Sequence, residues 1–297
     1  MANSITLFKA YLPILDEVYK RASLTSVLDG APELARQGVN ANELIIQKLS
    51  MAGLANYSRN GGYVAGDVTL TNETVKCNFD RGRMFNVDYL DNLETAAVAF
   101  GRLAGEFTRT RVVPELDAFR LAKYASATGI GDKSETLDTG AKVIKALRVA
   151  HAAMDEAEVP MENRILFITS ALKGAVDDLD TTASRAAMDL ASGVIVVPQT
   201  RFYTAIKQND GTTSGETDGG YAKATAGLNI NFMLIHKDAV IQYQKHVMPK
   251  VVTPEQNQDA DAWKFGYRNV GIADVYANKV AGIYCNHVAA PAQGDGT

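Results

Sequence analysis

Cysteine, histidine and tryptophan are scarce in this sequence, which holds two, four and one of them in 297 residues. Cys77 and Cys285 lie far apart and form no CxxC pair, so they indicate neither a zinc site nor a disulfide framework. Buried free thiols in a reducing compartment are favoured over a pair that joins two subunits. No histidine has a second histidine or a cysteine at the spacing of metal ligands.

The short motifs that mark common catalytic and nucleotide-binding sites are also missing. The sequence contains no GxSxG, HExxH or GxGxxG pattern. The segment GIGDKS at 129–134 lacks the glycine directly before lysine that a phosphate loop requires. Asp259 and Asp261 lack the glycine and the distal glutamate of an EF-hand loop. We therefore expect no catalytic residue, no metal, no cofactor and no enzymatic activity.

Two further absences concern partners. The chain has 30 Lys and Arg against 34 Asp and Glu, a formal net charge of −4. A protein that reads DNA sequence needs a surplus of basic residues, so we expect no sequence-specific nucleic-acid binding. No stretch reaches the roughly 18 apolar residues of a membrane span, and the amino-terminal segment lacks the apolar run of a signal peptide. We expect no membrane partner.

What is present is enough apolar material for a core, 46% of the residues, arranged in clear periodic patterns. Residues 5–20 have apolar side chains at helical spacing, which predicts an amphipathic segment that needs a partner surface. The run ANELIIQKLSMAGLA at 41–55 predicts a helical patch.

Residues 63–90 alternate apolar and polar side chains, which predicts strands. We expect turns at 71–73 and at 80–83, where Gly82 could adopt a positive φ without steric cost. A two-stranded ribbon is marginally stable alone in water. This ribbon is therefore expected to lie on its own body or on a neighbouring molecule.

Residues 91–125 predict one very long helix. Asp91 and Glu94 have the spacing of a capping box, and an apolar stripe follows that is displaced around Pro114. A continuous helix here would span about 50 Å at about 1.5 Å per residue. Its opposite face is charged, and the pattern alone leaves open whether that face meets solvent or another subunit.

The rest of the chain predicts an α/β unit followed by strands. The expected elements are a helix at 139–159, a strand at 165–169, a helix at 170–179, a strand at 193–198, an exposed loop at 207–227, a strand at 230–236, a strand at 246–252, and two or three strands with a turn at Asn278. This order gives an α+β fold class.

The order of these parts, and the amino-acid sequence of several segments, resembles the major capsid protein of tailed bacteriophages, whose fold is shared with encapsulin shell proteins. The segments that carry the resemblance are YLPILDEVYKRASLTSVLD at 11–29, FDRGRMFNVDYLDNLETAAVAFGRLAGEFTR at 79–109, RFYTAI at 201–206 and TPEQNQDADAWKFGYRNVGIADVYANKVAGIYCNH at 253–287. The resemblance covers most of the chain.

The resemblance implies a division into four units. They are an amino-terminal arm at 1–52, an extended β-hairpin loop at 53–90, a peripheral domain with the spine helix at 91–138 and 246–297, and an axial domain at 139–245. In that family the arm reaches neighbouring subunits, the extended loop lies over the adjacent subunit, and the axial domain points at five-fold and six-fold centres.

The resemblance also implies a function. Many copies would assemble as hexamers and pentamers into an icosahedral shell around double-stranded phage DNA, in the virion, after assembly in the cytoplasm of a host bacterium. Scaffolding, portal and decoration proteins would be partners, and because this chain has no room for a cleaved scaffold segment ahead of its arm, a separate scaffold is expected. Two alternatives stay open: an encapsulin-like compartment that holds cargo protein, and a soluble α/β enzyme with an unrecognised site.

Residues at subunit contacts follow from the same resemblance. Arg81 and Arg83, at the expected hairpin tip, are candidate donors to a neighbour's carboxylates, with solvated turn arginines as the alternative. Phe79, Arg109 and Arg111 are further contact candidates.

Two devices of the family map onto further residues. The arm and ribbon would flex at their bases, and the candidate hinges are Gly61, Gly62 and Gly66. Some relatives join a loop lysine to a neighbour's asparagine by an isopeptide bond, for which the candidates here are Lys76 with Asn269 or Asn278.

Overall fold

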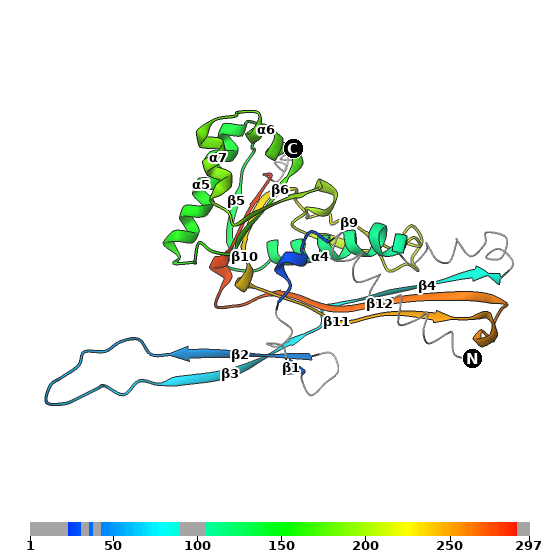
Figure 1. Ribbon diagram of the computed structural model, residues 1–297, viewed down its shortest axis with the longest axis horizontal. Coiled ribbons are helices and arrows are strands. Elements are labelled where there is room, and N and C mark those ends of the chain that lie inside the picture. The colour runs from blue at the N-terminus through cyan, green and yellow to red at the C-terminus, as the bar shows by residue number, and fades with distance from the viewer. Residues whose placement is uncertain (1–22, 31–35, 38–42, 90–104, 290–297) are drawn as a thin grey trace, which may run out of the picture.

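The computed structural model describes residues 23–30, 36–37, 43–89 and 105–289. Within them strands and helices mix in an α+β fold, as predicted. The body contains a five-stranded sheet. Figure 1 shows the ribbon of β2 (Glu43–Met51) and β3 (Val68–Lys76) and the sheet of β4 (Phe79–Asp88), β11 (Val240–Val252) and β12 (Ala262–Val275) extending from this body in opposite directions. The predicted segment 5–20, the predicted capping box and the carboxyl-terminal tail lie outside the described residues. No helix among those residues is long and apolar enough to cross a bilayer.

The five-stranded sheet holds the main core. Its strands, in spatial order, are β5 (Gly131–Ser134), β13 (Ile283–His287), β10 (Ile230–His236), β6 (Arg164–Thr169) and β7 (Gly193–Val197). Along β6 and β10 the side chains alternate between two apolar clusters, Phe167 and Met233 in one, Leu166 and Phe232 in the other. Both faces are therefore covered, which explains why the central residues of these strands are apolar on both faces.

Three helices cover one face of this sheet: α5 (Gly140–Glu156), α6 (Ser170–Asp177) and α7 (Thr182–Asp189). Helix α5 begins after Thr139, whose hydroxyl accepts from the Lys142 amide at 3.4 Å, in the manner of an N-cap. The predictions for α5, β6, α6 and β7 are confirmed. Helix α7 was not predicted, because its eight residues give too short a pattern.

The predicted long helix is confirmed over its described part, while residues 90–104 lie outside it. It ends in α4 (Val113–Ala125), which follows a π-helical turn at Thr108–Val112. The Val113 amide donates to the Thr108 carbonyl five residues back. The helix thus continues through Pro114, and the wider turn accounts for the displaced apolar stripe.

A second sheet is formed by β11 (Val240–Val252), β12 (Ala262–Val275) and β4 (Phe79–Asp88), with β12 in the middle. The predicted turn at 80–83 is wrong, because Gly82 pairs with Arg268 in the middle of β4. A Cβ at Gly82 would lie 2.7 Å from the Tyr267 carbonyl oxygen. Glycine at position 82 allows β4 to lie close to the backbone of β12. In a single sequence, a glycine that allows such close packing cannot be distinguished from a glycine in a turn.

A third sheet forms the projecting ribbon. Strands β2 (Glu43–Met51) and β3 (Val68–Lys76) pair antiparallel, with β1 (Arg36–Gln37) beside β2. The helical patch predicted at 41–55 is wrong, as is the turn at 71–73, which lies inside β3. A short apolar run is compatible with both the helical and the strand period, so periodicity alone cannot separate them. Here residues 43–51 form a strand because they pair with nine residues of β3.

The loop predicted at 207–227 has more structure than expected. Strands β8 (Ile206–Gln208) and β9 (Tyr221–Lys223) pair at its base. Burial raises the pKa of Tyr221 to about 12, and its hydroxyl donates to the Thr200 carbonyl at 2.9 Å. The predicted strands at 230–236 and 246–252 are confirmed, as are two final strands with Asn278 in the turn between them.

The two thiols should differ sharply in reactivity. Cys285 on β13 is fully buried, and burial raises the pKa of its thiol, whereas Cys77 is only half-buried. In a thiol titration of the folded subunit we expect one reactive cysteine, with the second appearing only in denaturant, because the thiolate is the reacting form. A C77S variant that still reacts quickly when folded would contradict this.

His151 on α5 makes stability depend on pH. Burial lowers the pKa of its imidazole, and the nearby Arg164 guanidinium lowers it further, against the opposing effect of Asp155. The unfolded chain therefore binds the proton first, and the free energy of unfolding falls as pH drops below about 6.5. Denaturant unfolding between pH 7.5 and 5.5 should show this slope, and H151M should reduce it. His236, whose pKa burial also lowers, should carry the remaining slope.

Candidate intersubunit contact sites

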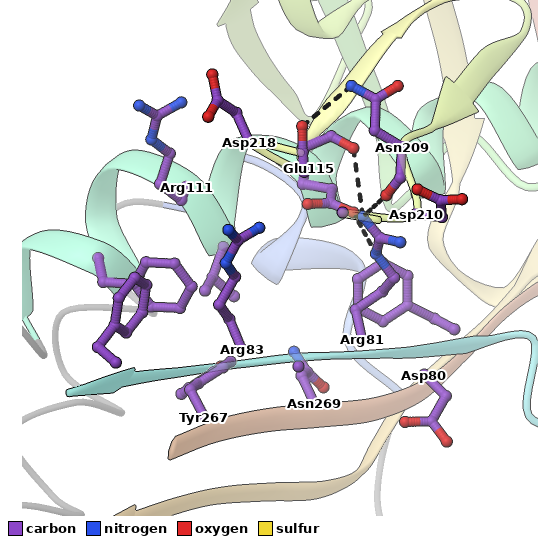
Figure 2. Close-up of a pocket in the computed structure, with 18 residues that line it drawn as sticks. Asp80, Arg81, Arg83, Arg111, Glu115, Asn209, Asp210, Asp218, Tyr267 and Asn269 are labelled. Atoms are coloured by element: carbon purple, nitrogen blue, oxygen red, sulfur yellow. Dashed lines mark hydrogen bonds and ion pairs between the residues drawn. The ribbon is translucent and has the colours of Figure 1, made fainter. Parts of the chain in front are cut away.

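Arg81 on β4 joins three parts of the subunit (Figure 2). Its Nε donates to Glu115 Oε1 on α4 at 2.8 Å, and its Nη2 donates to the Asn209 carbonyl at 2.7 Å and the Gly220 carbonyl at 3.3 Å. Asn209 and Gly220 are the two ends of the loop beyond β8 and β9. One half-buried guanidinium therefore ties this loop to the helix and to the second sheet.

The loop 209–220 is itself ordered by local hydrogen bonds. Asp210 accepts from the amides of Thr212 and Thr213, both at 2.8 Å, and from the Thr213 hydroxyl at 2.6 Å. These bonds lower the pKa of the Asp210 carboxyl. Arg83 on β4 adds a bond from its Nη2 to the Thr217 carbonyl at 3.0 Å.

A cavity of about 580 Å³ lies between β4, β12, the helix around Val112 and this loop. We call it the arginine cavity. Its lining includes Phe85, Phe107, Tyr267, Arg83, Arg111, Asp218 and Asn269. Figure 2 shows Arg83, Arg111 and Asp218 around the same open space, with Asn269 below them, while Asp80 points away from it.

Asn269 is the unusual member of this cavity. Its side chain is 1% exposed, and within the described part of the chain neither its amide nitrogen nor its oxygen has a hydrogen-bond partner. Arg111 and Asp218 have no ion pair with another described residue. Leaving the buried Asn269 amide unpaired is costly. Of these three side chains, only the exposed Arg111 and Asp218 can be reached by a group that enters the cavity.

The predicted contact residues fall into different environments. Phe79 is 3% exposed and packs in its own subunit against Phe119, at 5.1 Å between ring centroids. Arg81 and Arg83 lie in mid-strand and bind their own chain, which corrects their expected place at a hairpin tip. Arg109 is exposed and pairs with Glu106 at 2.7 Å. A role for these residues between subunits stays a prediction.

The actual end of the projecting ribbon is the loop 52–67, which we call the tip loop. Apart from Gly62, every residue from 51 to 71 whose exposure is described is exposed. Gly61, Gly62 and Gly66 lie in this tip loop and not at the base of the ribbon, where Glu43 pairs with Lys76. Their expected position at a basal hinge is therefore corrected, because a bend at the tip leaves the base in place.

The crosslink candidates differ in access. Lys76, at the end of β3, and Asn278, before β13, are exposed, whereas the Asn269 amide is buried within its own subunit. An isopeptide bond through Asn278 would need no rearrangement of the core. An isopeptide bond through Asn269 would first require this buried side chain to become accessible. The crosslink stays a prediction.

A buried polar hub that sequence reasoning missed holds residues 23–25, which lie within the predicted arm. The Asp117 carboxylate, on α4, is fully buried and accepts from the Ser23 hydroxyl at 2.8 Å, the Leu24 amide at 3.0 Å and the Thr25 hydroxyl at 2.7 Å. Arg201 adds a bond at 3.4 Å. The chain at Ser23 is therefore fastened to the spine helix.

The hub continues through Gln242 of β11. Its amide nitrogen donates to the Thr25 carbonyl and to Asp29 Oδ1, both at 2.7 Å, and its oxygen accepts from the Tyr124 hydroxyl at 2.8 Å. Burial raises the pKa of Asp29, which the Arg120 guanidinium partly offsets. The only signal in the sequence was the opposite charges of Asp117 and Arg120 within an apolar helix stripe.

Among the described residues no three or more His, Cys, Asp and Glu side chains are grouped so that they could hold a metal ion. The described surface instead carries exposed apolar residues on the projecting ribbon, such as Leu54 and Tyr63, and exposed guanidinium groups such as that of Arg109.

Comparison with known proteins places the fold. No protein-family model matches the chain, and no curated protein sequence matches it. Among solved structures, a chain of Mycobacterium phage Che8 has a TM-score of 0.57 at 12% identity, over 89% of this chain and 90% of that one. The capsid structure of the cyanophage P-SCSP1u gives 0.55 at 11% identity, over 86% of each chain.

A virus-like particle from Pyrococcus furiosus gives a TM-score of 0.57 at 11% identity, over 93% of this chain and 96% of that one. The likeness extends over nearly the whole length of each relative, although few residues are identical. The chain therefore has the fold of phage capsid proteins.

Proposed function

We propose that this protein is the major capsid protein of a tailed phage, and that many copies assemble into an icosahedral shell around double-stranded DNA. The observation that carries the proposal is the shared fold with phage capsid chains over about nine-tenths of the sequence. In this function the protein is structural and its partners are further copies of itself. Its place is the virion.

The ribbon gives the proposal physical support. Figure 1 shows β2, β3 and the tip loop extending away from the body. Its exposed apolar side chains include Leu54, Tyr63 and Val68, at 108%, 89% and 69%. An apolar two-stranded ribbon gains stability when another molecule covers it, and in a shell that molecule is the adjacent subunit.

The division into units is proposed with boundaries adjusted to the sheets. β5 and β13 belong to the five-stranded sheet with β6, β7 and β10, so they join the proposed axial domain and not the peripheral one. The proposed peripheral domain comprises the helix before Ser126 and the sheet of β4, β11 and β12. The proposed extended loop is the ribbon of β2 and β3, and the chain before Asp29 is the proposed arm.

The net charge of −4 supports a container for DNA. Affinity for a polyanion rises steeply with the number of basic contacts, and a wall that held DNA tightly would oppose its packing. Contacts with DNA are therefore proposed to be few and independent of sequence. Assembly in a bacterial cytoplasm, with a separate scaffold and a portal, belongs to the same proposal.

Shortening the ribbon tests the function. Met51 and Val68 are paired residues, so an Asn-Gly turn can replace residues 52–67 between them. The variant should unfold within a few degrees of the natural protein but form no closed shells by electron microscopy and sedimentation. If the natural chain, expressed alone or with its phage's scaffold, forms no shells, the proposed function is wrong. Normal shells from the shortened variant would show that residues 52–67 of the ribbon are not needed for assembly.

A second candidate keeps the fold and changes the contents. The fold is also shared with a virus-like particle from Pyrococcus furiosus, so an encapsulin-like compartment is the second candidate, and such a compartment would hold protein cargo. Purified particles decide between the two, since a phage shell holds genome-length DNA and a compartment holds a defined cargo protein.

A further inference from the structure

The tip loop contains a preformed turn that is held by contacts within residues 57–63. The Gly62 amide donates to the Ser58 carbonyl at 2.8 Å, the Ser58 amide donates back to the Gly62 carbonyl at 3.2 Å, and Gly62 has φ +74°. Tyr57 and Tyr63 flank the turn with ring centroids 4.9 Å apart. We call residues 57–63 the tyrosine knob.

This knob is exposed, and backbone hydrogen bonds between Ser58 and Gly62 close its turn. Tyr57 and Tyr63 are 60% and 89% exposed, and Arg59 at the apex has no ion pair with another described residue. An exposed aromatic pair has the composition of a binding hot spot. Because the turn is already formed, binding loses little conformational entropy.

The arginine cavity has matching chemistry. Its aromatic wall is formed by Phe85, Phe107 and Tyr267, with Phe107 packed against both others. Its two guanidinium groups, from Arg83 and Arg111, have no carboxylate partner among the described residues. Guanidinium groups stack on tyrosine rings, so Tyr57 and Tyr63 suit these two arginines.

The remaining charges match in the same way. Asp218, at the rim of the cavity, has no described partner and could pair with Arg59. A polyanion such as DNA is a poorer occupant, because Asp218 and Asp210 both line the cavity. At about 580 Å³ the cavity is in the size range of sites that bind small molecules, about 300–1,000 Å³, so two phenol rings can enter it.

The knob and the cavity of one molecule cannot meet. Figure 1 shows the tip loop at one end of the long axis, and β4, β12 and α4 on the other side of the body. Resting on the proposed assembly into a shell, we propose that the tyrosine knob of one copy enters the arginine cavity of the adjacent copy. Tyr57 and Tyr63 contact Arg83 and Arg111 there, and Arg59 pairs with Asp218.

A charge exchange tests the contact. R59D and D218R should each lower the yield of closed shells by about tenfold or more, because like charges then face each other at every contact. The double variant R59D/D218R should restore most of the yield. R148D reverses an equally exposed arginine on α5 and serves as the matched control, with shells expected at the natural yield. Thermal unfolding of unassembled subunits checks that each variant folds.

A crosslink tests the location directly. With p-benzoyl-L-phenylalanine in place of Tyr57, irradiated shells should give crosslinked dimers whose joined peptides map to 79–88, 105–115 or 209–220. Crosslinks only elsewhere, or single charge variants that assemble at the natural yield, would overturn the contact while leaving the shell function intact. A natural chain that forms no shells under any assembly condition would overturn both.

Discussion

D117A is expected to lower the free energy of unfolding by about 3–5 kcal/mol, the cost of breaking a buried ionic network from one side. The substitution leaves the Ser23 and Thr25 hydroxyls and the Leu24 amide without their acceptor. It also removes the negative charge that faces Arg201 and lies near Arg120, which is 1% exposed. Equilibrium denaturation of unassembled subunits measures the loss.

The matched control is D138A, which removes a carboxylate from an exposed pair with Lys142. Exposed pairs contribute about 0–1 kcal/mol, so this variant should stay close to the natural protein. A D117A effect no larger than that of D138A would show that the hub is not needed for stability. Because the hub fastens Ser23 to α4, D117A should also increase protease cleavage before residue 30 ahead of global unfolding.

Two glycine substitutions in neighbouring helices should have opposite signs. A Cβ on Gly140, the first residue of α5, would lie 2.1 Å from the Ala175 carbonyl oxygen of α6. G140A must therefore push two packed helices apart, and we expect a loss of about 1–3 kcal/mol or more, the usual cost of overpacking. Thermal or denaturant unfolding gives the value.

Gly174, in the middle of α6, provides the internal control. A Cβ there would have no atom within 4 Å, and alanine is favoured over glycine in a helix by about 0.5–1 kcal/mol. G174A should therefore stabilise the protein. If both variants shift the unfolding midpoint in the same direction, the contact between α5 and α6 is not the one described.

The elements predicted well from sequence share one property. Helix α5 and strands β6 and β10 are buried over most of their length or along one full face, so their pattern of apolar residues follows from covering the core. Local chemistry agrees with that pattern, as at the Thr139 cap of α5. When residue propensity, apolar periodicity and capping residues all indicate the same element, a single sequence is enough to predict that element.

The elements predicted wrongly depend on partners distant in the chain. Strand β2 is decided by its pairing with β3, and the place of Gly82 by β12, nearly 190 positions later. Arg81 was identified as a contact residue, but its partners Glu115, Asn209 and Gly220 carry no local signal. Asp117 looked like one more charge on a helix.

By itself, the sequence determined the α+β class, the described part of the long helix, the α/β unit and the strands within 63–90. Only the tertiary structure decided where the projecting ribbon of β2 and β3 ends and that Ser23 hydrogen-bonds to the Asp117 carboxylate. It also decided that the guanidinium groups of Arg83 and Arg111 line a cavity without a carboxylate partner among the described residues. The reason is physical. Periodicity records burial along one segment, whereas hydrogen-bond partners and cavities arise only when segments far apart in the chain are brought together.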